Sequence, residues 1–258
     1  MVLHNGPLSG EAALRAALMQ VGGGARLGGV TSLEVDGLKG FDEPRIHIWV
    51  PKSRRKLEPR KDIPGCVVLH ETRRWTLDDT IEVGLPRSTR AVATLQAALW
   101  ARSPRQAALC LVMPIQQRLV RADDVAVELA RVKRHEFRRA LTSVLADIMG
   151  GVQSLNELDF AAECRRRGLP EPTRQEVRRL PNGRVYLDVR WAQYGVCVEV
   201  NGAGHDALDV AMRDEVRLAQ LQATGDAALP MSVLTLRVDP EPFFSALRQV
   251  LISRGWRA

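Results

Sequence analysis

Apolar and polar residues alternate within the stretch RVYLDVRWAQYGVCVEVNGAGH, which begins at Arg184. Alternation with a period of two places the apolar side chains on one face of a strand and the polar ones on the other. The pattern predicts two strands joined as a β-hairpin, with AQYG as the loop. In that register Trp191 faces Val196, and Asp188 faces Glu199.

The facing pair Asp188 and Glu199 is unfavourable for stability, since two carboxylates directly opposite each other repel by roughly 0.2–1 kcal/mol. A divalent cation between them would remove this repulsion, because hard cations bind carboxylate oxygens. The pair therefore favours a metal site. The alternative interpretation is the solvated face of a half-exposed sheet, on which the two side chains splay into water.

Helical spacing of apolar residues, together with caps and breakers, predicts a series of helices along the chain. They cover about 9–20, 30–38, 89–101, 104–117, 123–131, 137–149, 154–167, 206–224 and 241–253. Short apolar or alternating runs predict further strands at 45–50, 65–70, 80–85, 173–180 and 231–237. Ser9 and Ser88 are expected to cap the helices that follow them. Ser103-Pro104 is expected to begin another helix, with Pro104 in its first turn, and Pro114 to disturb the end of that helix.

The pattern changes near Gly150, which marks the expected domain boundary. Residues 1–150 mix helices with short strands and predict an α+β domain. Residues 151–258 follow the order helix, three antiparallel strands, helix, strand, helix. That order predicts an α/β domain with a small mixed sheet flanked by helices.

Basic residues are in excess, with a formal net charge of +7 and an isoelectric point of about 9.7. This excess favours an anionic partner, nucleic acid first and an anionic membrane surface second, although solubility alone is an alternative explanation. Arg54, Arg55 and Lys56 lie in a basic segment that is expected to form a long hairpin loop and to contact phosphates. Arg213 and Arg217, four residues apart on a predicted helix, are further candidates. A solvated charged surface is the alternative for both groups.

The four cysteines are far apart and have neither zinc-ligand nor disulfide-framework spacing, which favours the reducing cytoplasm. The sequence has no apolar run of about 18 residues or more, so no membrane helix is predicted. The N-terminus does not resemble a secretory signal. The first half shows no catalytic constellation, because His47, His70 and His135 are isolated in the sequence.

The spacing D-x10-E-x-N at Asp188, Glu199 and Asn201, on a hairpin preceded by a helix with an acidic residue, resembles the PD-(D/E)xK nuclease superfamily. Further blocks are similar to a bacterial domain related to the very-short-patch-repair endonucleases, which occurs in AbiEi-like antitoxins of type IV toxin–antitoxin systems. These blocks are GLPEPTRQ, NGRVYLDVRW, VCVEVNGAGH, RDEVRLAQL and VLTLRV. The resemblance covers about 153–258 and implies a restriction-endonuclease-like sheet. The winged helix-turn-helix that usually begins the complete relatives is not recognisable before Ser9.

The resemblance implies a site for Mg²⁺ or Mn²⁺ at this hairpin. Asp188 and Glu199 match the two metal-binding carboxylates, and Glu157 matches an acidic residue that can complete the metal shell. A metal held there polarises the scissile phosphate and lowers the pKa of a bound water. Alternatively, Glu157 forms a capping box with Ser154 at the start of its helix.

Three more polar residues match family positions that assist catalysis. Gln175 matches a polar residue of the first strand, Asn201 occupies the place of the usual lysine, and His205 matches a histidine after the turn. His205, with an unperturbed pKa of about 6.5, can act as a base, whereas Asn201 has no titrating group. The alternatives are an ordinary strand residue for Gln175 and the start of the next helix for His205.

Two functions of different classes follow from the sequence. The first is a cytoplasmic, metal-dependent DNA endonuclease or nickase, acting in DNA repair or phage defence. The second is a non-catalytic DNA-binding regulator of the AbiEi type with a toxin as its partner, which the missing lysine at Asn201 favours. An RNA-directed nuclease is a weaker third. A single site per chain nicks a duplex unless two copies assemble as a homodimer.

Overall fold

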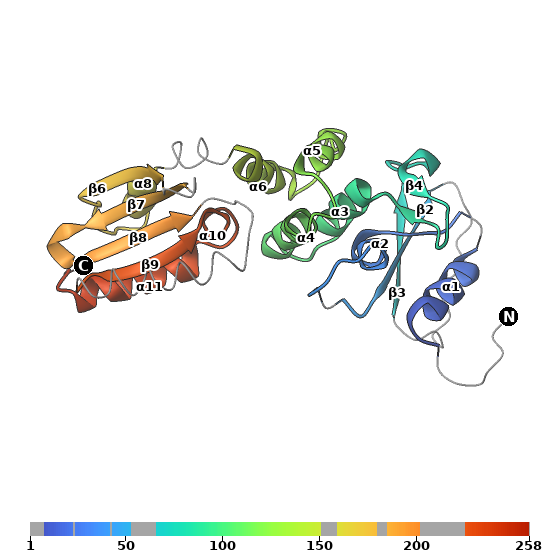
Figure 1. The fold of residues 1–258 in the computed structure, drawn as a ribbon, viewed down its shortest axis with the longest axis horizontal. Coiled ribbons are helices and arrows are strands. Elements are labelled where there is room, and N and C mark those ends of the chain that lie inside the picture. The colour runs from blue at the N-terminus through green and yellow to red at the C-terminus, as the bar shows by residue number, and fades with distance from the viewer. Residues whose placement is uncertain are drawn as a thin grey trace. The chain divides into compact units, whose positions relative to one another are not determined.

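The computed structural model describes residues 8–22, 24–41, 43–52, 66–150, 159–179, 185–201 and 225–257. They form a mixed α/β structure with two small mixed sheets, each flanked by helices (Figure 1). The chain divides into two compact units, Met1–Arg138 and Arg139–Ala258. The division falls at the start of α6 (Arg138–Gly150), whereas the sequence pattern placed it at the end of that helix. Ile148 of α6 packs against the core of the C-terminal unit, which explains the difference.

The sheet of the N-terminal unit has five strands in the order β3-β2-β1-β5-β4. They are β1 (Arg26–Leu27), β2 (Ile46–Pro51), β3 (Val67–Thr72), β4 (Thr80–Ile81) and β5 (Arg87–Ser88). β1 runs antiparallel to β2 and parallel to β5, and β4 runs antiparallel to β5. The sequence predicted β2 and β3 and a longer β4. It did not predict β1 and β5, which are too short to show an alternation.

β2 and β3 run parallel, with Ile46 beside Val67 and Pro51 beside Thr72. The predicted hairpin between them is therefore wrong, because a hairpin joins antiparallel strands. The sequence pattern identified both strands, but an apolar run carries no information about the direction of its neighbour.

The helices of the N-terminal unit are α1 (Gly10–Val21), α2 (Gly29–Val35), α3 (Arg90–Leu99), α4 (Pro104–Gln116) and α5 (Ala122–Ala130). α4 begins at Pro104 as predicted, and Ser103 caps it, because the Ser103 Oγ accepts a hydrogen bond of 3.2 Å from Gln106 N. Pro114 lies inside the last turn of α4. Ser88 belongs to β5, and Thr89 takes the cap position of α3. Within the described residues, no helix combines the length and apolar character needed to cross a membrane.

The sheet of the C-terminal unit has four strands in the order β6-β7-β8-β9. They are β6 (Arg174–Arg179), β7 (Val185–Trp191), β8 (Val196–Asn201) and β9 (Ala227–Ser232). β6, β7 and β8 are antiparallel neighbours, and β9 runs parallel to β8. The hairpin register is confirmed, with Trp191 opposite Val196 and Asp188 opposite Glu199.

One face of this sheet is apolar and forms a core with α8 (Phe160–Arg166) and α11 (Glu241–Ser253). Trp191 is fully buried, and its Nε1 donates a hydrogen bond of 2.8 Å to Pro170 O. The Phe160 ring lies edge-on to Trp191, with 6.2 Å between the ring centroids, and 5.3 Å from Phe244. The bounds of α11 are those that the sequence predicted.

The stretch VLTLRV, predicted as a strand, is instead the helix α10 (Val233–Val238). β9 ends at Ser232, whose Oγ accepts a hydrogen bond of 3.2 Å from Leu234 N and so caps the helix. Val233 and Leu236, three residues apart, both pack into the core. A six-residue apolar run fits either element, and here the serine cap decides for the helix.

Arg237 at the end of α10 forms an ion pair with Asp147 of α6, with 2.9 Å between Nε and Oδ2. The Asp147 side chain is only 3% exposed, whereas that of Arg237 is 37% exposed. The pair therefore joins α6 to the C-terminal core.

Replacing Arg237 with methionine is expected to lower the free energy of unfolding by about 2 kcal/mol, because it removes a cation that pairs with a buried carboxylate. Asp147→Asn should cost less, since the amide oxygen of the new side chain can still accept a hydrogen bond. Urea denaturation of both variants checks this order. Equal stability of Arg237→Met and wild type would contradict it.

Two histidines that are separate in the sequence meet in the N-terminal unit. His47 Nδ1 lies 2.9 Å from His70 Nε2, so the two rings share a hydrogen bond. The His70 ring also stacks on Trp100, with centroids 3.5 Å apart and planes 3° from parallel. Parallel pairing of β2 and β3 places the two histidines on adjacent strands, which corrects the interpretation of them as isolated.

Burial lowers the pKa of His70 to about 3, helped by the charges of His47 and Arg45, and burial also lowers the pKa of His47. Both groups bind protons more readily in the unfolded chain, where the pKa is about 6.5. The stability that comes from keeping both rings neutral is therefore fully present above about pH 6.5 and is lost as the pH falls below it. The slope should stay under about 1.4 kcal/mol per pH unit for each histidine, because each ring takes up at most one proton on unfolding.

Denaturation at pH 7, 6 and 5 measures this loss. His70→Phe keeps a ring against Trp100 but removes one titrating group, so its stability should depend less on pH. An unchanged acid slope in that variant would contradict the assignment.

Candidate functional site

The face of the C-terminal sheet opposite the core carries the polar side chains of the hairpin. Alternation places Asp188 and Arg190 of β7 on this face, because Leu187 and Val189 lie in the core. By the same alternation β8 presents Cys197, Glu199 and Asn201. This surface is the candidate functional site.

Three carboxylates lie in one row across this polar face. Glu176 of β6 is opposite Asp188 of β7, and Asp188 is opposite Glu199 of β8. The sequence predicted the second pairing but not the first. Because a shift of one residue in the register of β6 exchanges its two faces, the choice between Gln175 and Glu176 could not be made without the strand pairing.

Asp188 is the buried member of the row, with 7% of its surface exposed. The thiol of Cys197 lies diagonally across the strand pair and donates a hydrogen bond of 3.1 Å to Asp188 Oδ1. Burial, followed by the hydrogen bond and charge of Asp188, raises the pKa of the Cys197 thiol. Cys197 therefore stays protonated at neutral pH and holds one oxygen of the carboxylate.

Among the side chains that the structure describes, Arg174 and Arg190 bring positive charge to this face. Arg174 forms an ion pair with Glu176, and Arg190 forms one with Asp226. The pKa of Arg174 is raised mainly by Glu176, and the charge of Asp188 acts in the same direction. Guanidinium groups thus stand beside the carboxylate row, although Asn201 occupies the position at which the family resemblance implies a lysine.

Gln175 was predicted as a catalytic residue, but it lies on the opposite face of the sheet. It pairs with Val189, whose side chain is in the core. Its Oε1 accepts a hydrogen bond of 3.1 Å from Phe160 N at the start of α8. Gln175 therefore holds the first turn of α8, and the candidate polar residue on this strand is Glu176.

Asn201 ends β8 on the same face as Glu199, opposite Tyr186, and is half-buried. Its amide offers hydrogen-bonding groups but no charge. The remaining predicted site residues lie outside the described residues: Glu157, His205, Arg54, Arg55, Lys56, Arg213 and Arg217.

Asp188 and Glu199 provide the type of oxygen ligands that Mg²⁺ and Mn²⁺ bind. Among the described residues, no group of three or more His, Cys, Asp or Glu side chains is arranged to hold a metal ion. A metal ion held by this pair would therefore need water and substrate oxygens to complete its coordination, as is usual for Mg²⁺.

Comparisons with protein-family models, curated proteins and solved structures gave no match. The function is therefore inferred from the chemistry of the polar face, with the paired carboxylates Asp188 and Glu199 at its centre.

Proposed function

We propose that the C-terminal unit is a metal-dependent DNA endonuclease or nickase of the PD-(D/E)xK type. The observation that carries the proposal is the direct opposition of Asp188 and Glu199 on the polar face of a mixed sheet. Two carboxylates placed directly opposite each other repel, and a divalent cation bound by both removes that repulsion. The small mixed sheet flanked by helices supports the proposal, in which this unit has a restriction-endonuclease-like fold.

In this proposal Asp188 and Glu199 hold Mg²⁺ or Mn²⁺, which when bound polarises the scissile phosphate and lowers the pKa of a bound water. The Cys197 thiol fixes the orientation of Asp188 through Oδ1, so the ion would meet a carboxylate that is already positioned. Glu176, one strand further along the row, is the nearest additional carboxylate in the strand register.

Arg174 supplies positive charge that the missing lysine would otherwise provide. Its guanidinium is exposed and pairs with Glu176, so it can move to a phosphate when the substrate binds. Asn201 donates hydrogen bonds through its amide and contributes no base. Stabilisation of the developing charge by a positioned cation is a large term in phosphodiester hydrolysis.

The test is cleavage of supercoiled plasmid, linear duplex, single-stranded, mismatched and flapped DNA by the full chain, with Mg²⁺, Mn²⁺ or a chelator. We expect DNA cleavage that requires Mg²⁺ or Mn²⁺ and stops when the chelator is added. Nicks without linearisation indicate that a monomer acts, and double-strand cuts indicate a homodimer. Metal-independent cleavage, or none on any substrate, contradicts the proposal.

The second candidate is a non-catalytic, AbiEi-like regulator that binds its own promoter and a toxin partner. The uncharged Asn201 on the carboxylate face favours it, because a lost lysine is a route by which a nuclease site becomes inactive. Specific retardation of its promoter in a gel shift, with no cleavage under any metal, would support this function over the first.

A further inference from the structure

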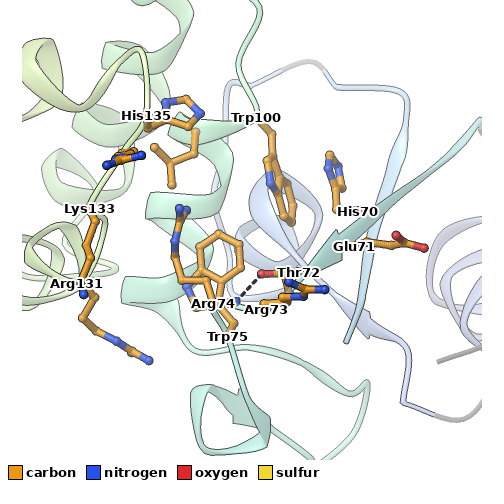
Figure 2. A pocket seen from close by; sticks show the side chains of 12 residues that line it. His70, Glu71, Thr72, Arg73, Arg74, Trp75, Trp100, Arg131, Lys133 and His135 are labelled. Carbon is orange, nitrogen blue, oxygen red and sulfur yellow. Dashed lines mark hydrogen bonds between the residues drawn. The ribbon is translucent and has the colours of Figure 1, made fainter. Parts of the chain in front are cut away.

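An open pocket of about 680 Å³ lies in the N-terminal unit, away from the carboxylate row (Figure 2). It is formed where β3 and α3 end and by the segment that follows α5. Aromatic and basic side chains from these three places line it. Of the histidines noted in the sequence, His70 and His135 belong to this lining.

The aromatic wall of the pocket is held in one orientation. The Trp100 ring stacks on His70 and meets Trp75 edge-on, with centroids 6.1 Å apart. A Cβ atom at Gly28 or Gly29 would lie 2.8 Å or 2.9 Å from the Trp100 ring, so the ring packs directly against backbone at the start of α2. Burial keeps His70 neutral by lowering its pKa to about 3, so this wall carries no charge of its own at neutral pH.

Cations surround the aromatic wall. Within the described part of the chain, Arg73, Arg74, Lys133 and Arg134 form no ion pair with a carboxylate. The Arg74 guanidinium lies 5.4 Å from the centroid of the Trp75 ring. In Figure 2, Arg131 and Lys133 lie on one side of Trp100 and His70 lies on the other, whereas Arg73 lies below, beside Thr72.

Arg131 also lines the pocket, but Asp79 and Glu128 already neutralise it, at 2.8 Å and 2.7 Å. Glu71 is the one acidic side chain among the described residues of the lining. The lining therefore has four cations that no described carboxylate neutralises and one acidic side chain. The pocket is strongly positive as a result.

We propose that this pocket binds single-stranded nucleic acid, with the basic side chains on the phosphates and Trp100 against a base. Cationic grooves with aromatic side chains bind single strands because phosphates meet the cations while unpaired bases stack on the rings. Binding here does not depend on catalysis at Asp188, so it goes beyond the proposed nuclease function and can be tested separately.

A single strand fits this lining better than the alternatives. A duplex covers the faces of its bases and would use only the cations. An acidic peptide would likewise gain little from a neutral aromatic wall, whereas a base contributes stacking of about 10-fold in affinity for each ring engaged. The combination of a fixed tryptophan and several cations therefore selects for phosphates that carry exposed bases.

The test is fluorescence anisotropy of labelled oligonucleotides with the full chain, in chelator so that no cleavage occurs. The probes are an oligodeoxythymidine, an oligouridine and a DNA duplex of equal length. We expect a single strand to bind more tightly than the duplex. A preference for deoxyribose or for ribose identifies the ligand as single-stranded DNA or as RNA. Trp100→Ala should weaken single-strand binding by about 10-fold and leave duplex binding little changed.

The double variant Lys133→Ala with Arg134→Ala should weaken binding and reduce its salt dependence by about 0.7 in slope for each phosphate that is no longer neutralised. Arg15→Ala with Arg121→Ala is the matched control, since it removes two exposed charges of the same unit outside the pocket. Because Trp100→Ala affects packing, Trp100→Phe is measured beside it and should bind nearly as well as wild type. Tighter binding of the duplex, or equal weakening in the control and Lys133/Arg134 variants, would overturn the proposal.

Discussion

Replacing Asp188 with asparagine is expected to lower the proposed metal-dependent DNA cleavage by at least about 100-fold, since loss of even an outer-shell partner of a metal ligand costs about 10–100-fold. The substitution removes the charge that would bind the cation but keeps an oxygen that can accept the Cys197 thiol hydrogen bond. The fold should therefore persist. Cleavage rates on supercoiled plasmid, with far-UV circular dichroism of the same samples, measure the two properties.

Glu171→Gln is the matched control for this variant. Glu171 belongs to the same unit and pairs with Arg165 at 3.2 Å, with both side chains more than half exposed. Exposed pairs contribute little, so cleavage by Glu171→Gln should equal that of wild type. If Asp188→Asn cleaves as fast as this control, the carboxylate row is not the active site.

Replacing Trp191 with alanine is expected to cost about 3–5 kcal/mol of the free energy of unfolding. The ring is fully buried between the hairpin and α8, and its removal also leaves the Pro170 carbonyl without its donor. A domain has only about 5–15 kcal/mol in total. The C-terminal unit of this variant should therefore be close to unfolding, while the N-terminal unit is unaffected.

Trp191→Phe separates the two contributions, because it fills most of the space but cannot donate to Pro170. Its cost should be about 1–3 kcal/mol. Ile252→Ala, on the exposed side of α11, is the control and should lie within about 0.5 kcal/mol of wild type. Urea denaturation followed by circular dichroism ranks the three variants. A loss below about 1 kcal/mol for Trp191→Ala would contradict the assigned core.

The elements with strong local patterns were predictable from the sequence. The hairpin register followed from two alternating runs and a short loop, and α11 followed from its apolar spacing. The strand predicted for VLTLRV is wrong, because a short, mainly apolar stretch fits a strand or a helix and here Ser232 caps a helix. The hairpin predicted for β2 and β3 is wrong, because the direction of one strand relative to another is set by tertiary packing.

The candidate site was predictable only in part, for the same reason. Asp188 and Glu199 are close in sequence, so the hairpin fixes their opposition. Whether Gln175 or Glu176 lies on the polar face depends on the pairing of β6 with β7, which no local pattern determines. The hydrogen bond of His47 with His70 requires the parallel pairing of two strands that the sequence pattern indicated as a hairpin.

The most direct test of the central claim is the anomalous scattering of crystals soaked in Mn²⁺. We expect a manganese ion bound by carboxylate oxygens of both Asp188 and Glu199, at about 2.0–2.2 Å, the range for small hard cations. The ion should be absent from crystals of Asp188→Asn. Crystals that diffract well and show no manganese at this pair, under conditions in which DNA is cleaved, would contradict the claim.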